Sequence, residues 1–512
     1  MAGSPYKIST GLLGLGIVAL TLGSAAIAAW HAGGGEIVAA DLAALRFTLV
    51  QAAWSAGISC GVAVPLARAL ARRRFAGRAL LIRLLAAPFL LPVIVAVLGI
   101  LAVFGRQGPV NQLLLTFGLP SFSIFGLHGV VLAHVFLNLP LAARMVLLGW
   151  QSIPAERFLV ARALGMDSPA QFRHLELPML GAVLPGAIAT VFLLCLTSFA
   201  VALLLGGGPA ASTLELSIYQ ALRFEFDPGH AAMLAMLQFG LCATVTLAAL
   251  QIRRSMQFGA GLGRDQQVPA PLGWRNGIDV AMIGLAGVFL LGPVLALIAR
   301  GIPGLWDLPA SLPGAIFRSL VLAIASAVLA AAVALTLAQA VVRGARWLEL
   351  VAMLPLTASG LVIGTGLFLA VRPVFSPETL ALPLTFLVNA LLAVPFVFRL
   401  LLPEAQSLQT DYGRLTGSLG LKGMARLRLV TLPRLARPLG FGAGLAAALS
   451  MGDLGVIALF AGERGVTLPL LVQRLMGAYR MEAAAGVSLV LIVCSFALFW
   501  IFDRLGARHA AA

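Results

Sequence analysis

The sequence predicts an all-α polytopic membrane protein with about twelve transmembrane helices, arranged as two parallel six-helix units. Three observations lead to this prediction. Apolar residue types make up 60% of the 512 residues and charged residues only 11%, which leaves too little polar surface to cover soluble domains. The apolar residues gather in runs long enough to cross a bilayer. The second half of the chain also repeats landmarks of the first at a constant offset.

The apolar runs place the membrane spans. The first run follows Lys7 and is longer than the apolar region of a cleaved signal peptide, so we expect a span there. With about 20 residues needed for each crossing, the expected spans are residues 11–30, 47–67, 84–104, 126–149, 180–205, 231–252, 278–299, 319–342, 350–371, 380–402, 438–461 and 484–502.

The basic residues predict the orientation of these spans. A net charge of +16 would suggest a nucleic-acid partner for a soluble protein. With both termini placed in the cytoplasm, however, most Lys and Arg residues fall in cytoplasmic segments, as the positive-inside rule requires. The charge therefore needs no nucleic acid to explain it, and none is expected.

The repeat divides the chain into two units. Landmarks of the first half recur 255 residues later: Pro140 as Pro395, Arg144 as Arg399, Gly165 as Gly420, and Leu177-Pro178 as Leu432-Pro433. We therefore expect a first unit at 1–252, a cytoplasmic linker at 253–277 and a second unit at 278–512. Parallel repeats imply a pseudo-two-fold axis along the membrane normal, with a pathway between the halves.

Each unit carries one long shared cytoplasmic loop, at residues 156–178 and 411–433. Gly165 and Gly420 permit a positive φ and are expected to end one short helix. A second short helix is expected to begin at Ser168, whose sequence Ser-Pro-Ala-Gln has the form of a capping box.

Apolar side chains three residues apart lie on one face of this second helix. They are Phe172 and Leu175 in the first loop, and Leu427 and Val430 in the second. The following prolines, Pro178 and Pro433, are expected to start the next transmembrane helix. One interpretation is that each loop docks into a groove on a cytoplasmic partner, and the other is that it is a basic loop packed on its own bundle. Because the loop occurs twice with the same spacing, we favour docking.

The glycine and the Leu-Pro pair that follows it resemble the EAA loop of binding-protein-dependent ABC importer permeases. The coupling helices of that family fit clefts in cytoplasmic ATPase subunits. The family's Glu-Ala-Ala falls on residues 159–161 and 414–416, so its glutamate is missing from both loops. The resemblance assigns the ATPase-coupling role to Gly165, Leu177, Pro178, Gly420, Leu432 and Pro433.

Longer stretches are similar to thiamine transporter permeases of Gram-negative bacteria. They are FGRQG at 104–108, LAHVFLNLPLA at 132–142, the segment 198–238 and SMGDLGVIALF at 450–460. The resemblance covers most of the chain and implies a type I ABC importer fold. It also implies import of thiamine and its phosphate esters from a periplasmic thiamine-binding protein, two ATPase copies as partners, and a bacterial inner membrane location with both termini cytoplasmic.

The chain is not expected to hydrolyse ATP itself. A P-loop lysine follows glycine and precedes Ser or Thr, whereas Lys7 precedes isoleucine and Lys422 follows leucine. ATP and magnesium are therefore expected on the partner ATPase, with no cofactor on this chain. No residue grouping points to a catalytic or metal site.

Two helices are expected to line the pathway. Charge in hydrocarbon costs several kcal/mol and marks function by default, and Asp453 lies in the eleventh span, where the offset pairs it with Ser198 in the fifth. Asp453 would offset the desolvation of thiamine's permanent positive charge, although a packing role in the bundle is also open.

Other polar residues left two interpretations open. Glu215, Tyr219 and Gln220 follow the fifth span on the outer side, and they fit either contact with substrate or binding protein, or a plain surface helix. His134 and Asn138 lie one turn apart in the fourth span and are expected to bond neighbouring helices.

The sequence also admits three alternative functions. A ferric-iron importer shares the fused layout of two permease units. An ion-coupled secondary transporter also often has twelve spans, but such carriers commonly place several charges at mid-membrane, where we find Asp453 alone. An integral membrane enzyme is disfavoured because no catalytic constellation is present.

Overall fold

A computed structural model describes the following residues of the chain: 4–34, 36–78, 81–82, 91–208, 211–252, 275–421, 423–462 and 465–511. Every secondary-structure element in these ranges is a helix. Eleven of the helices are long and apolar enough to cross a membrane, and a bent pair brings the total to as many as twelve. The prediction of an all-α polytopic membrane protein is confirmed. The linker expected at 253–277 and the start of the third span, 84–90, fall largely outside the described residues.

Helices of the first half follow the order α1 (Ser4–Val18), η1 (Ala19–Gly23), α2 (Ser24–His31), η2 (Ala32–Gly34), α3 (Ala39–Arg72), α5 (Val93–Phe104), α6 (Pro109–Thr116), α7 (Leu127–Gln151), α8 (Ala155–Ala163), α9 (Ser168–Gln171), η4 (Phe172–Glu176), α10 (Leu177–Leu196), α11 (Ala200–Leu205), α12 (Leu214–Arg223) and α13 (Pro228–Ile252). Most of them have a counterpart of similar length in the second half.

The second half contains α14 (Arg275–Gly304), α15 (Leu312–Val342), α16 (Trp347–Met353), η6 (Leu354–Thr357), α17 (Gly360–Val371), α18 (Ala381–Ser418), α19 (Gly423–Arg426), η7 (Leu427–Thr431), α20 (Leu432–Met451), α21 (Gly455–Phe460), α22 (Leu468–Gly477) and α23 (Met481–Ala511). The run from α9 to α11 recurs as α19 to α21 at the same 255-residue offset.

Equivalent hydrogen bonds accompany the repeated helices. The backbone N–H of Leu214, at the start of α12, donates to Oγ1 of Thr48 on α3 at 3.0 Å. The N–H of Leu468, at the start of α22, donates to Oγ of Ser319 on α15 at 2.8 Å. In both halves, a hydroxyl on a long helix therefore satisfies an N–H at a helix start that has no partner within its own helix.

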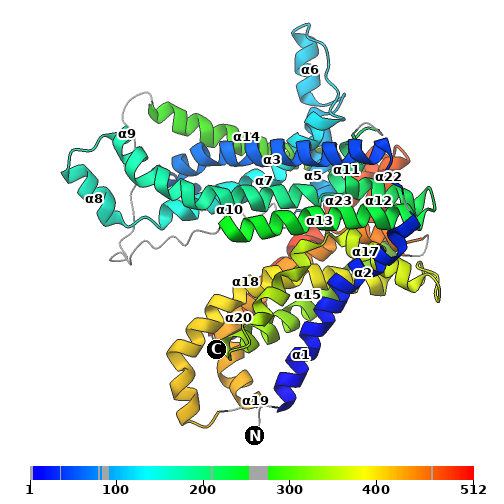
Figure 1. The fold of residues 1–512 in the computed structure, drawn as a ribbon. Coiled ribbons are helices and arrows are strands. Elements are labelled where there is room, and N and C mark those ends of the chain that lie inside the picture. Colours follow the sequence, from blue (N-terminus) through cyan, green and yellow to red (C-terminus); the bar gives the residue numbers. More distant parts are fainter. Residues whose placement is uncertain are drawn as a thin grey trace.

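The first helix of each half packs against the other half. Figure 1 shows α14 beside α3 in one bundle and α1 beside α15 in the other. Glycines allow the close crossings: a Cβ at Gly99 of α5 would lie 2.7 Å from the carbonyl oxygen of Pro293 on α14, and one at Gly366 of α17 would overlap the backbone of Ser24 on α2. Small residues let membrane helices approach closely. The chain division at 252 and 278 stays a prediction, and in space the halves are interlocked.

The ninth expected span, 350–371, is bent. Helices Trp347–Thr357 and Gly360–Val371 meet at 88°, so the expected span is divided between two helices. Oγ of Ser359 accepts the N–H of Val362 at 3.1 Å, and a hydroxyl in this position favours the start of a new helix.

The two bundles diverge toward the ends that carry α8 and α9 in one bundle and α19 in the other (Figure 1). They converge at the opposite end, near α12, α17 and α22. Within the described residues, a large cluster of buried apolar side chains draws on both halves, including Ile94, Leu214, Val362 and Phe460. The shared core therefore holds the bundles together away from the two repeated loops at 156–178 and 411–433, which we call the docking loops.

Candidate functional site

A cavity of about 390 Å³ lies between the two halves, and its lining comes from both. Two expected spans break at its wall. The chain leaves α10 at Leu196 and resumes as α11 at Ala200, and it leaves α20 at Met451 and resumes as α21 at Gly455. The fifth and eleventh expected spans, 180–205 and 438–461, are therefore each interrupted near their ends. Breaks of this kind are tolerated at membrane depth where the backbone lines a cavity.

Ser198 and Asp453 lie in these two breaks, and both line the cavity. The Asp453 carboxylate accepts the backbone N–H groups of Val456 and Ile457, each at 3.3 Å. It therefore caps α21, since a short carboxylate suits the unpaired N–H groups of a helix start. The side chain therefore holds the local backbone and also lines the cavity, and its role toward a substrate stays a prediction.

Asparagines on α7 and α18 tie the broken helices to their neighbours. Nδ2 of Asn389 donates to Oγ of Ser450 at 3.1 Å, and Nδ2 of Asn138 donates to Sγ of Cys195 at 3.4 Å. Ser450 and Cys195 are equivalent at the 255-residue offset. Asn389 was not identified from the sequence, although it is the equivalent of the polar residue His134 at the 255-residue offset.

His134 on α7 is buried, with 2% of its surface exposed, and lines the cavity. Its Nδ1 lies 3.4 Å from Oγ of Ser55 on α3, as expected for a side chain that bonds a neighbouring helix. The other ring nitrogen, Nε2, is buried and has no hydrogen-bond partner in the described part of the chain.

Glu215 also lines the cavity and is 1% exposed, so the plain surface helix is wrong for this residue. Thr213 caps α12 by accepting the N–H of Leu216 at 3.3 Å, which places Glu215 in the first turn. Burial raises the pKa of Glu215, which lies outside the candidate membrane spans, to about 8, and Ser359 and Gln238 partly offset this effect. Its Oε1 has no hydrogen-bond partner in the described ranges.

Tyr219 and Gln220 lie further along α12 and are half-buried. The Tyr219 ring packs edge-on against Phe199, with centroids 5.1 Å apart, and Phe199 lines the cavity. Tyr219 therefore packs against the cavity-lining ring of Phe199 without lining the cavity itself. The structure does not place Gln220 among the described lining residues.

Both docking loops turn at the predicted glycines. The φ angles of Gly165 and Gly420 are +70° and +63°, which glycine adopts without the strain that a Cβ introduces. The cap of α9 is one residue earlier than expected: Oδ1 of Asp167, not Ser168, accepts the N–H of Ala170 at 2.9 Å. In the second loop, α19 begins at Gly423.

The second helix of each loop is not separate from the span that follows. Helices α10 and α20 begin at Leu177 and Leu432, so Pro178 and Pro433 lie in their first turns, as predicted. The preceding helical residues nevertheless join them without a break, over 168–196 and 423–451. A wide π-helical turn precedes each proline. Because proline lacks an N–H, such a turn allows the helix to pass through it.

The apolar residues predicted on the second helix of each loop are not fully exposed. Phe172 and Leu175 pack against a buried apolar cluster that contains Trp150 and Phe158. Val430 packs against the large cluster shared by both halves, and Leu427 is half-buried. Leu177 and Pro178 are exposed, whereas Leu432 and Pro433 are partly exposed.

Exposed apolar side chains lie instead just before the two glycines. Val160 and Leu164 are 57% and 71% exposed, and their equivalents Leu415 and Leu419 are 52% and 63% exposed. Each pair is spaced i, i+4 and so shares one helix face. We call these four residues the docking pairs. Both halves are apolar at these positions, but the same is true of Phe172 with Leu427 and of Leu175 with Val430, so the repeat alone does not identify the exposed pairs.

Glu176 anchors the first loop to α3. It is 1% exposed, and its carboxylate lies 2.6 Å from Nε of Arg68 and 3.6 Å from Nη2 of Arg72. The Arg68 guanidinium also covers the Phe172 ring, 4.7 Å from its centroid. This ion pair was missed because Glu176 and Arg68 are distant in sequence.

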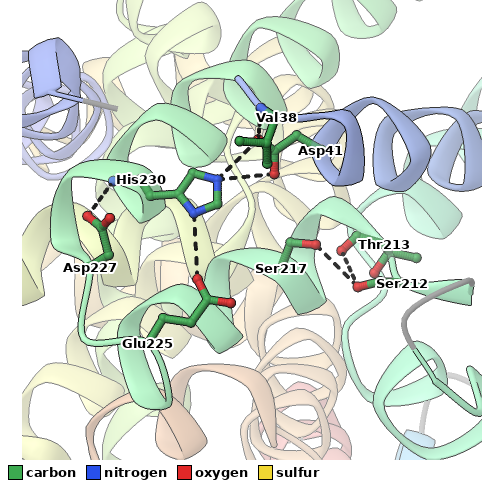
Figure 2. Close-up of polar contacts among 8 residues, drawn as sticks. All are labelled: Val38, Asp41, Ser212, Thr213, Ser217, Glu225, Asp227 and His230. Atoms are coloured by element: carbon green, nitrogen blue, oxygen red, sulfur yellow. Dashed lines mark hydrogen bonds and ion pairs between the residues drawn. The ribbon is translucent and has the colours of Figure 1, made fainter. Parts of the chain in front are cut away.

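A second polar cluster lies at the start of α3, at the end opposite the docking loops. Figure 2 shows His230 between Asp41 and Glu225. Nε2 of His230 is 3.1 Å from both Asp41 carboxylate oxygens, and Asp41 also accepts the N–H of Val38 at 2.9 Å. One carboxylate therefore caps α3 and holds the start of α13 beside it.

Comparisons with known proteins give a consistent result. No family model matches the chain. The chain is 39% identical to the thiamine transport system permease protein of Salmonella typhimurium, over 91% of this chain and 89% of the relative. It is 38% identical to the proteins of that name from Brucella abortus, over 100% and 98%, and Escherichia coli, over 91% and 89%. Identity of this extent over nearly the whole length shows that the chain belongs to the family of thiamine transport system permease proteins.

Proposed function

We propose that this chain is the permease subunit of an ATP-driven, binding-protein-dependent importer that carries thiamine and its phosphate esters across the bacterial inner membrane. The observation that carries the proposal is a cavity shared by two halves, each with its own docking loop, in a chain that matches thiamine transport permeases over nearly its full length. The names of these relatives do not favour ferric iron as the cargo or an ion-coupled mechanism.

The docking pairs are the surfaces proposed for two copies of a cytoplasmic ATPase subunit. Each pair is apolar, exposed, and followed by a glycine turn. A groove that receives one helix face matches this shape. The ATPases would supply the nucleotide site, and the permease would contribute movement of its bundles rather than catalysis.

The proposed pathway runs through the cavity past Ser198, Asp453 and Glu215. Divergence of the bundles toward the docking ends fits an arrangement that is open to the cytoplasm (Figure 1). The converged end would then face the periplasmic thiamine-binding protein. Cytoplasmic termini are consistent with the packing of Gly506, near the end of α23, beside Ala436 just after the second docking loop.

Reconstituted uptake tests this proposal. The permease, its ATPase and the thiamine-binding protein are placed in proteoliposomes, and uptake of labelled thiamine is measured with and without ATP. We expect uptake to require ATP and binding protein. Uptake that survives without ATP but stops when the proton gradient is collapsed would show a secondary transporter instead.

The docking pairs are tested by replacing Leu164 and Leu419 with aspartate together. A charge on each apolar face should abolish co-purification of the ATPase and ATP-dependent uptake. Val374→Asp is the matched control, because Val374 is an equally exposed apolar residue, at 72%, outside both docking loops. Retained ATPase binding in the double variant would place the docking surface elsewhere.

A further inference from the structure

Two buried polar atoms at the cavity have no partner in the described part of the chain. They are Oε1 of Glu215 and Nε2 of His134, whose residues are 1% and 2% exposed. Both residues line the cavity and both belong to the first half. An unsatisfied buried polar group destabilises a folded protein, so each such group calls for an explanation.

Polar groups that the second half contributes to the same cavity already have partners. Asn389 donates to Ser450, Asp453 caps α21, and Ser359 caps α17. At the 255-residue offset Asn389 is the equivalent of His134. These polar groups of the second half are therefore satisfied. Ser359 and Gln238 also interact with the Glu215 carboxyl of the first half. Oε1 of Glu215 and Nε2 of His134 nevertheless have no partner in the described ranges and stay available to a molecule in the cavity.

The chemistry of the lining selects the class of that molecule. Carboxyl groups of Glu215 and Asp453 line the cavity, and no lysine or arginine is among its described lining residues. The rings of Phe199 and Phe396 are part of a wall that is otherwise mainly aliphatic. Carboxylates and aromatic faces both attract cations, and a mainly apolar wall with a few polar groups suits a small organic ligand.

We propose that the first half of the cavity recognises the transported molecule directly. Glu215 accepts an N–H group or faces the positive charge of a small cationic heteroaromatic ligand, and Nε2 of His134 hydrogen-bonds one of its ring or exocyclic heteroatoms. The second half supplies the opposite wall. This inference rests on the proposed function, in which the cavity is the pathway, and it deepens that function by making the permease itself selective.

Thiamine has the required chemistry. Its thiazolium ring carries a fixed positive charge, and its aminopyrimidine ring carries an exocyclic amine with two N–H donors. The cavity, at about 390 Å³, lies within the range of roughly 300–1,000 Å³ that is typical of small-molecule sites. Binding inside the permease would be weaker than to the binding protein, because the molecule must leave again.

Direct binding tests the inference without transport. The purified permease–ATPase complex, without binding protein, is titrated with millimolar thiamine, and its thermal stability is followed. An analogue in which an uncharged ring replaces the thiazolium is titrated in parallel. We expect thiamine to stabilise the wild-type complex and the neutral analogue to do so much less.

Two variants test the residues. Glu215→Gln keeps the shape but removes the charge, and it should weaken thiamine binding about tenfold or more. His134→Gln should weaken binding of thiamine and of the neutral analogue by similar factors. The matched control is Thr365→Val, because Thr365 is also buried with a partnerless Oγ1 in the described part of the chain but does not line the cavity, so the affinity for thiamine should stay largely unchanged. ATPase co-purification checks that each variant is folded.

The outcomes separate the two proposals. Unchanged thiamine affinity in Glu215→Gln and His134→Gln, or an equal loss in Thr365→Val, would overturn recognition by the first half even if wild-type uptake is ATP-driven. Absence of ATP-driven thiamine uptake in the wild-type system would overturn the proposed function, and the binding series would still decide the inference.

Discussion

The two halves share a helical plan but differ in where they bury charge. Glu176, beneath the first docking loop, corresponds to Thr431 in the second half at the 255-residue offset. Glu215 lies in the first turn of α12, and the same position in α22 is occupied by Pro469. The repeat therefore preserved the helix positions, whereas the carboxyl groups that are buried among the described residues, those of Asp41, Glu176 and Glu215, all belong to the first half.

The docking loops differ in the same way. In the first half, Pro154 separates α7 from α8, because proline disfavours helical geometry in the residue before it. Gln409 occupies the equivalent position, and α18 continues through it to Ser418. The first loop is thus bent and anchored by an ion pair, and the second is the extension of one long helix. Equal spacing of the motifs therefore does not require the two loops to have the same conformation or the same anchoring contacts.

The largest expected effect comes from breaking the buried ion pair. Glu176→Gln leaves Arg68 and Arg72 without their counter-charge, and loss of one partner from such a pair costs about 3 kcal/mol. Thr431→Val, the matched change in the second half, should cost under about 1 kcal/mol. Thermal or denaturant unfolding of the two purified variants measures the difference, and equal losses would contradict the asymmetry between the loops.

A smaller effect is expected from pH. The ordinary pKa of a glutamate is 4.5, and burial raises that of Glu215 to about 8, so its carboxylate form becomes rarer as the pH falls below 8. Since a cation binds the carboxylate, thiamine affinity should fall by up to about tenfold per pH unit below 8 and level off above it. The second half has no titrating group at this position. Titrations across this interval should give a flat profile for Glu215→Gln, and a wild-type profile of equal flatness would remove Glu215 from the site.

The smallest effect is expected where the halves agree. Gly165→Ala and Gly420→Ala each place a Cβ on a residue with positive φ, at a cost of about 1 kcal/mol. Nothing lies within 4 Å of either added Cβ, so the backbone conformation alone sets the cost. Unfolding measurements should therefore give similar losses for both variants. A clear inequality would show that one loop adopts another conformation.

Composition and spacing alone predicted the membrane class, the number of spans, the repeat and the glycine turns. These properties are local or periodic: apolar run length sets the span, and the need for positive φ selects glycine. The cavity residues Ser198 and Asp453 were also found, since charge within an apolar run stands out. Val160 and Leu164 were overlooked, because nothing in the sequence says which apolar residues of a loop helix face outward.

Only the tertiary structure decided how the halves meet. Gly99 and Gly366 look like ordinary membrane glycines in the sequence, yet each admits the first helix of the opposite half. The breaks after Leu196 and Met451, the partnerless atoms of His134 and Glu215, and the pairing of Glu176 with Arg68 all depend on contacts between distant segments. Sequence determines which stretches become helices because that preference is local, whereas the burial of a particular side chain depends on which other helix packs over it.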